Sequence, residues 1–316
     1  LRKDEEYKID QKNYIRARLF DMLIGDWDRH TDQWRWARFD KGKERIYRPI
    51  PRDRDQAFCN YDGALTNFIK FIIPTTRKFE VYDEDLNNVR WINESGIKLD
   101  RALVSEADEE VWVEQAEYIQ KYMTDDKIKY AFDQLPKEVR DSVALNIEEN
   151  LKLRRSSLKD IASRYYNYLA RHIVVTGTDK DDFFEITRKK NATEIKVFRI
   201  IDGKPKKQFF SKIIDSKVTN EVWVYGLDDD DQFVVKGKGR NPVKIRIVGG
   251  QNNDTYEIQR GRKIRIYDHL TKSNTVKNKG GAYIQLSDNY NQNLYDINKN
   301  IDHTNTITPL LGFNPD

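Results

Sequence analysis

The ten residues from Gly25 to Trp34, GDWDRHTDQW, combine three carboxylates, an arginine, a histidine and an amide. Such a segment is too polar for a buried strand, and its two tryptophans are unusual in a solvated loop. Phosphoryl transfer uses residues of these types, because it needs an Asp that orients the acceptor hydroxyl and oxygen ligands that hold Mg²⁺ on the phosphates. The segment is therefore either a phosphate-handling site or a charged corner of the fold.

A second acidic run, PRDRDQAF, follows at residues 51–58. Between the two runs, QWRWARF and RIYRPI alternate as strands do, and the turn DKGK predicts that they form a hairpin. Kinase folds carry their catalytic and metal-binding residues in this order of loop, hairpin and loop. The residues expected to converge on one cleft, within reach of a single divalent ion, are Asp28, Gln33 and either Asp53 or Asp55.

IGDWDRHTDQW followed by PIPRDRDQAF resembles the catalytic and metal loops of atypical kinases. These include phosphoinositide kinases, HipA-like kinases, secretory-pathway kinases with an Asp-Arg-His run, and CotH spore-coat kinases. The resemblance implies that Asp28 is the catalytic Asp and that Arg29 and His30 brace its loop. It also implies Mg²⁺ as a cofactor, with Gln33 at the position of a metal-binding Asn and with Asp53 or Asp55 as the metal Asp.

The chain departs from the kinase pattern in two ways. The side chain of Gln33 is one carbon longer than that of Asn, and only 27 residues precede Asp28, too few for a glycine-rich nucleotide lobe with its Lys. The residues also allow a structural interpretation, because Asp-Arg-His-Asp runs form buried ion-pair networks at helix ends. In that case RDRD after the second strand is an alternation of surface charges.

The first 172 residues are predicted to form a helical domain similar to a kinase C-lobe. Apolar residues at Ile15, Leu19, Met22 and Leu23 have helical spacing, so we expect a helix over residues 11–24 that ends at Gly25. Periodicity and capping residues predict further helices over residues 105–123, with Ser105 as N-cap, and over 124–135, 136–155 and 157–173.

Residues 173–290 have the alternation of an all-β domain, which we expect to be a solenoid or a sandwich. A turn motif recurs in it, in which a Gly is followed by an Asp five positions later and an aromatic residue seven positions later. The three copies are Gly177, Asp182 and Phe184; Gly226, Asp231 and Phe233; and Gly249, Asp254 and Tyr256. We expect the aromatic side chains inside and the Asp side chains capping the turns. The overall prediction is an α+β fold.

Calcium is the alternative ligand of these turns. GGQNNDTYE resembles the Gly-Gly-x-Gly-x-Asp repeat of calcium-binding β-rolls, with Asn252 in place of the third Gly. Calcium sites of that kind lie between consecutive copies, whereas the copies here are 49 and 23 residues apart. We therefore favour structural roles over calcium binding for Asp182, Asp231 and Asp254.

Composition excludes several classes of function. The net charge is +4, with both signs interspersed, which argues against a nucleic-acid partner. The basic clusters at residues 188–190 and 204–207 are expected to be solvated. Cys59 is the single cysteine, so neither an internal disulfide nor a cysteine metal site can form. The histidines His172, His269 and His303 have no metal-ligand spacing.

The order of these parts resembles the middle region of certain large bacterial envelope proteins. The segments that carry the resemblance are RYYNYLARHIVVTGTDKDDFF, VYGLDDDDQF, RIVGGQNNDTY and the ending TITPLLGFNPD. Those proteins have a calcineurin-type metallophosphoesterase domain upstream and a BamA-like surface-antigen barrel in the outer membrane downstream. The resemblance implies a location in the periplasm or outer membrane, with those two domains as partners in the same polypeptide.

Two functions follow as hypotheses. In the first, the chain is an internal piece of a longer protein, a linker or scaffold with a degenerate kinase-like site that meets the membrane only through the barrel. Residues 291–316 then form an extended lead-in to that barrel. In the second, the chain is part of a Mg²⁺-dependent phosphotransferase whose nucleotide lobe lies upstream.

Overall fold

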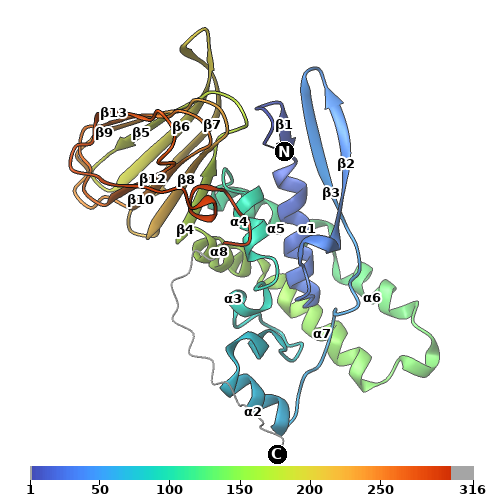
Figure 1. Cartoon of the computed structure of the whole chain (residues 1–316). Coiled ribbons are helices and arrows are strands. Elements are labelled where there is room, and N and C mark those ends of the chain that lie inside the picture. The colour runs from blue at the N-terminus through green and yellow to red at the C-terminus, as the bar shows by residue number, and fades with distance from the viewer. Residues whose placement is uncertain (1, 300–316) are drawn as a thin grey trace, which may run out of the picture.

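A computed structural model describes residues 2–299, in which helices dominate the first half and strands the second (Figure 1). The fold is α+β, as predicted from the sequence. The β half begins with a strand at His172, next to the predicted boundary. The predicted extended lead-in at 291–316 is wrong at its start, because a short helix spans Tyr290–Asn293, and from position 300 onward it lies outside the described residues.

Helix α1 (Gln11–Ile24) is central to the helical half and matches the predicted range. The Asp10 carboxylate caps its first turn, and Gly25 ends it at φ 75°, in the left-handed region that favours glycine. The other helices are α2 (Ala64–Ile72), α3 (Val89–Ile92), α4 (Ile97–Leu103), α5 (Glu109–Tyr122), α6 (Asp125–Asp133), α7 (Ser142–Ser156), α8 (Leu158–Leu169) and α9 (Tyr290–Asn293).

Two predicted helix starts are wrong. Helix α5 begins after Asp108 rather than at Ser105, because Lys212 of the β half bonds the carbonyl of Ala107 and the Asp108 carboxylate and holds this segment as a turn. Helix α7 begins after Asp141, whose carboxylate accepts the N–H groups of the first helical turn. The segment before Asp141 contains only a short 3₁₀ turn, Lys137–Val139.

A small sheet stands beside α1 and contains the predicted hairpin. Strands β2 (Trp34–Lys41) and β3 (Glu44–Pro51) pair antiparallel, and β1 (Tyr7–Ile9) pairs parallel with β3. The hairpin carries the chain from the first acidic run to the second. The two runs therefore meet again at its base, next to the end of α1.

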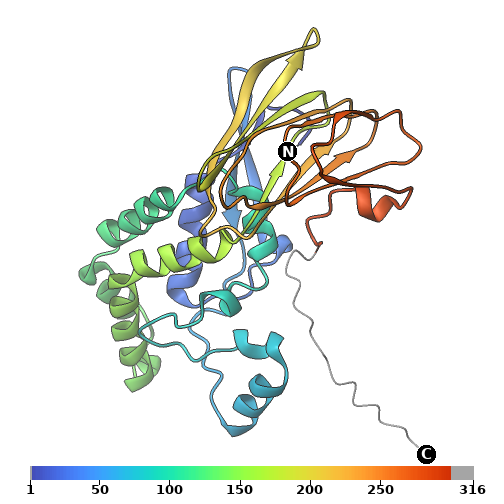
Figure 2. The same cartoon turned by 90° about the vertical axis from the view of Figure 1, so that its left-hand side faces the viewer.

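The β half is a parallel solenoid with two facing sheets (Figure 2). Each coil gives one strand to each sheet. One sheet consists of β4 (His172–Thr176), β8 (Glu221–Leu227), β10 (Lys244–Gly250), β12 (Ile264–Asp268) and β14 (Tyr283–Leu286). The other consists of β5 (Asp182–Arg188), β9 (Gln232–Gly237), β11 (Thr255–Ile258) and β13 (Thr275–Asn278), extended by β6 (Ala192–Ile201) and β7 (Lys204–Asp215). Of the two alternatives open from the sequence, the solenoid is the one observed.

The repeated aromatic residues form one stack inside the solenoid. Phe184, Phe233 and Tyr256 are fully buried, with ring centroids 4.6 Å apart for the first pair and 5.3 Å for the second. Each ring follows its Asp by two residues and points to the same side of an extended chain. Their predicted position inside the β half is confirmed.

The basic cluster at 188–190 is only partly solvated, because the guanidinium of Arg188 is buried against backbone carbonyls.

Candidate functional site

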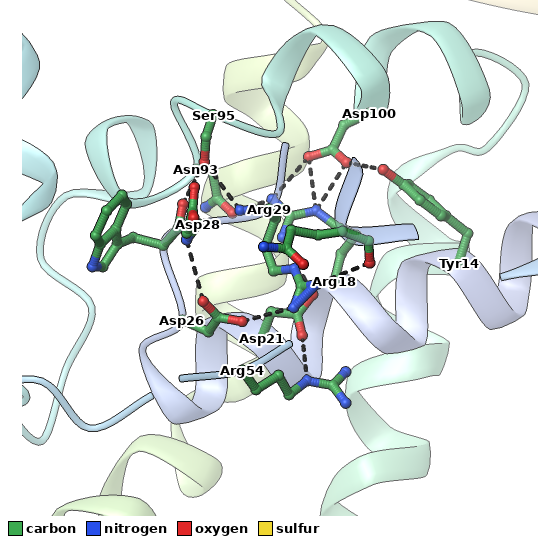
Figure 3. Close-up of polar contacts among 12 residues, drawn as sticks. Tyr14, Arg18, Asp21, Asp26, Asp28, Arg29, Arg54, Asn93, Ser95 and Asp100 are labelled. Carbon is green, nitrogen blue, oxygen red and sulfur yellow. Dashed lines mark hydrogen bonds and ion pairs between the residues drawn. The ribbon is translucent and has the colours of Figure 1, made fainter. Parts of the chain in front are cut away.

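Arg29 joins the two acidic loops. Its side chain is 1% exposed, and its guanidinium donates to the carbonyl oxygens of Gln33 (3.2 Å), Arg52 (2.6 Å) and Asp53 (2.8 Å). It also pairs with the Asp26 carboxylate at 2.8 Å. One buried cation therefore fixes the first loop to the end of the hairpin, and Figure 3 shows its contact with Asp26.

Asp21, in the last turn of α1, is the main counter-charge of this network. Its buried carboxylate lies 2.9 Å from Arg54 and 3.5 Å from both Arg18 and Arg29. Burial raises the pKa of Asp21, and the three guanidinium groups act in the opposite direction. Within the RDRD run, Arg54 thus points inward to a buried carboxylate, and the run is more than an alternation of surface charges.

A second buried ion pair supports the first. The guanidinium of Arg18 bonds the Asp100 carboxylate at 2.9 Å and the side-chain oxygen of Asn93 at 2.6 Å. Asp100 also accepts hydrogen bonds from the hydroxyls of Tyr14 and Tyr165. These contacts hold residues 93–100 against α1 (Figure 3).

Ser95 connects residues 93–100 to the first acidic loop by hydrogen bonds. Its hydroxyl accepts the N–H of Arg29 at 3.2 Å and donates to the carbonyl of Trp27. The backbone on both sides of Asp28 is therefore held from a segment that lies more than sixty residues further along the chain. A catalytic Asp would need such fixed backbone, and so would a purely structural corner.

The carboxylate of Asp28 is left half-buried at the edge of the network. Its backbone N–H bonds Asp26, while its Oδ2 lies 3.7 Å from Nε2 of His30, which is too long for a hydrogen bond. Nδ1 of His30 accepts the N–H of Asp32 at 3.3 Å. Asp28 and His30 are thus accessible to a ligand, as are the exposed residues Thr31 and Asp32 that follow them.

The predicted metal ligands are only partly brought together. Asp53 has φ 47° and presents its carbonyl to Arg29, whereas the side chains of Asp53 and Asp55 are on exposed residues. Within residues 2–299, no three Asp, Glu, His or Cys side chains group closely enough to hold a metal ion. Mg²⁺ commonly uses one or two carboxylates together with substrate phosphates. The convergence of Asp28, Gln33 and Asp53 or Asp55 on one ion therefore stays a prediction.

The turn aspartates of the solenoid form an aspartate ladder (Asp182, Asp231 and Asp254). The N–H of Asp182 donates to the carboxylate of Asp231 at 2.8 Å, and the N–H of Asp231 donates to that of Asp254 at 2.9 Å. Asn274 accepts the N–H of Asp254 at 2.8 Å as the fourth rung, and Arg199 pairs with Asp182 at 2.8 Å at the other end. The carboxylates thus connect successive coils, in addition to the turn bond from Thr178 to Asp182.

The ladder explains the glycine of the repeated turn. A Cβ added to Gly226 would overlap the Asp231 carboxylate, and a Cβ on Gly249 would overlap that of Asp254. In the fourth coil the register places Asp268 beside this glycine position, and its carboxylate accepts the Tyr256 hydroxyl at 2.6 Å. Sequence comparison of the copies missed this coil because it lacks both the Gly and the aromatic residue.

Burial sets the protonation of the ladder. It raises the pKa of Asp182 to about 7, although Arg199 opposes this shift, and the pKa of Asp254 to about 8, where the Asp268 carboxylate adds to the effect. The pKa of Asp231 is also raised, first by burial and then by its two neighbours in the ladder. The folded state therefore holds protons that the unfolded chain releases near pH 4.

This difference predicts that stability falls as pH rises. Groups with a raised folded pKa contribute stability that is fully present below the unfolded pKa, near 4, and is lost as the pH rises through the folded pKa values of about 7 and about 8. Replacement of Asp254 with Asn keeps a side-chain oxygen that can accept the N–H of Asp231, as the Asn274 side chain accepts the N–H of Asp254. The replacement removes one titrating carboxyl group. We expect thermal melts across this range to show a weaker pH dependence in Asp254→Asn than in the parent chain. An unchanged or steeper dependence would contradict the assignment.

Comparison with known proteins adds no relative to this geometry. No family model, no curated protein and no solved structure matches the chain.

Within residues 2–299, no helix is long and apolar enough to span a membrane.

Proposed function

We propose that the chain is a scaffold module of a bacterial cell-envelope protein, a linker whose kinase-like loops have become structural. The observation that carries this proposal is the position of Arg29. Its guanidinium is buried and bonded to three backbone carbonyls and to Asp26, so that the two loops form one fixed corner. The envelope location and the flanking phosphoesterase and barrel domains are part of the proposal and derive from the sequence resemblance.

Contacts between the two halves support a linker role. The guanidinium of Arg2 bonds the hydroxyls of Thr176 (3.2 Å) and Tyr295 (2.9 Å), and it lies 4.1 Å from the ring centroid of Tyr295. Lys212 of β7 is buried and pairs with Asp108 before α5 at 2.8 Å. Arg2 and Tyr295, near the two ends of the described residues, thus lie at one junction. This arrangement suits a module that keeps the two domains flanking it at a constant distance.

A phosphotransferase is the second candidate, and the accessible Asp28 carboxylate favours it. Arg29 brings the backbone of this loop to that of Asp53, which is the arrangement that catalytic and metal loops require. A nucleotide lobe would have to be supplied from outside these residues. A longer polypeptide with a glycine-rich strand pair and a Lys before this segment would favour this candidate.

Nucleotide binding tests whether this chain can act as the enzyme by itself, because the phosphotransferase candidate otherwise takes its nucleotide lobe from outside these residues. We expect the chain to bind ATP with millimolar affinity or not at all in calorimetry with Mg²⁺, because residues 2–299 contain no glycine-rich strand pair with a Lys that would position the phosphates. Asp55→Ala is the test variant, and Asp126→Ala, an exposed acid on α6, is its matched control. Micromolar affinity that is lost in Asp55→Ala and kept in Asp126→Ala would replace the scaffold proposal with the enzyme.

A further inference from the structure

Helix α2 is apolar, yet none of its residues is buried. Its side chains Leu65, Phe68 and Phe71 are 72%, 60% and 81% exposed, and Ile72 and Ile73 are more than two-fifths exposed. Water contact with so many large apolar side chains in nine residues is unfavourable, by about 1.5–3 kcal/mol for each fully exposed one. A contiguous apolar patch of this kind marks an interaction surface.

The helix lies at the end of the molecule away from the solenoid (Figures 1 and 2). The segment that follows α2 returns to the helical half through Phe79, whose ring lies 4.9 Å from that of Trp27 and 5.0 Å from that of Tyr61. Lys78 also holds this segment through an ion pair with Glu94 at 3.7 Å, and the Arg77 guanidinium lies 5.5 Å from the ring centroid of Trp91. The apolar face of α2 can therefore approach an extended surface without a steric barrier from the solenoid.

The charge of residues 64–79 indicates which kind of surface the apolar face of α2 contacts. Residues 64–79 contain Lys70, Arg77 and Lys78 and no acidic residue, in a chain that has 52 acids. Lys70 bonds the carbonyl of Tyr61 at 2.9 Å, and the Arg77 side chain bonds the carbonyl of Lys70 at 3.3 Å, so both cations stay close to the helix. A short apolar helix bordered by cations matches the boundary of an anionic lipid bilayer.

We propose that α2 inserts its apolar face into the surface of a bilayer with anionic headgroups. Nine residues are too few to cross a bilayer, so the helix lies in the interfacial region, with Lys70 and Arg77 at headgroup level. This membrane contact is separate from any barrel and does not depend on the scaffold role. It would set the orientation of the helical half relative to the membrane.

The test is co-sedimentation of the whole chain with vesicles of phosphatidylcholine alone or mixed with phosphatidylglycerol. We expect binding to the mixed vesicles that weakens at least about tenfold in the double variant Phe68→Ser and Phe71→Ser. The matched control changes two exposed apolar residues elsewhere, Tyr130→Ser and Leu145→Ser, which are 68% and 64% exposed. We expect this control to bind as the parent chain does.

A second double variant, Lys70→Gln with Arg77→Gln, tests the contribution of charge. It should remove most of the preference for vesicles that contain phosphatidylglycerol. Thermal melts of the two serine variants should coincide with that of the parent chain, because the changed side chains are exposed. Absence of vesicle binding, or equal loss in the Tyr130 and Leu145 control, would overturn the proposal. Concentration-dependent dimerisation that is lost in the Phe68 and Phe71 variant, without vesicle binding, would assign the face to a second copy of the chain instead.

Discussion

Replacement of Arg29 with Met should destabilise the helical half by about 3–5 kcal/mol, the usual cost when one partner of a buried ion pair is removed. Met fills much of the same volume but donates no hydrogen bond. The buried carboxylate of Asp26 and the carbonyls of Gln33, Arg52 and Asp53 would then lose their donor. Urea denaturation followed by tryptophan fluorescence measures the effect, since the Arg29 guanidinium lies 5.3 Å from the ring centroid of Trp34.

Asp28→Asn is the matched control, because Asp28 is the neighbouring residue and its carboxylate is half-exposed. We expect it to change the free energy of unfolding by less than about 0.5 kcal/mol. If Arg29→Met were mild and Asp28→Asn severe, the loops would not be held together by the buried guanidinium. Arg29 would then give no support to a scaffold role.

Local pattern in the sequence was enough to predict α1, the hairpin and the β character of residues 173–290. Each of these elements has a periodicity of its own, as in Ile15, Leu19 and Met22 of α1, and a clear end signal, such as Gly25. The repeat of Gly, Asp and an aromatic residue also located the stacked interior of the solenoid. Whether those strands formed a solenoid or a sandwich depends on pairing between distant coils, which local alternation does not specify.

The buried charges of the helical half could not be predicted with the same ease. Arg18 and Asp21 lie on the apolar face of α1 beside Leu19 and Met22, and charged residues at such positions are a signal of internal ion pairs. The main partner of Arg18, however, is Asp100, which lies 82 residues away in a segment without strong periodicity. The support of the Asp28 loop by this segment therefore came from the structure alone.

The second acidic run shows the limit of residue spacing as evidence for a site. In RDRD the sequence pointed to the carboxylates of Asp53 and Asp55, whereas in the structure the inward contact from this run is made by Arg54, with Asp21. The backbone at Asp53, with φ 47°, determines which side chains face outward. Spacing predicted that the two loops meet, and the backbone conformation decided which residues make the contact.

Replacement of Phe233 with Ala should be the most damaging single change in the solenoid, at about 3–5 kcal/mol. Phe233 is the middle ring of the aromatic stack, so its loss removes contacts with both Phe184 and Tyr256 and leaves a cavity between coils. The surrounding strands are tied by the aspartate ladder and by parallel pairing on both sides, which restricts collapse of the cavity. Thermal denaturation followed by circular dichroism measures the loss.

Phe183→Ala makes the same chemical change on the outer side of the neighbouring strand, where the ring is only partly buried and lies 6.2 Å from that of Phe198. Its smaller burial predicts a loss well below that of Phe233→Ala. Equal losses in the two variants would mean that the stack contributes no more than ordinary surface packing. A larger loss in Phe233→Ala would show instead that the buried rings, repeated from coil to coil, hold the solenoid together.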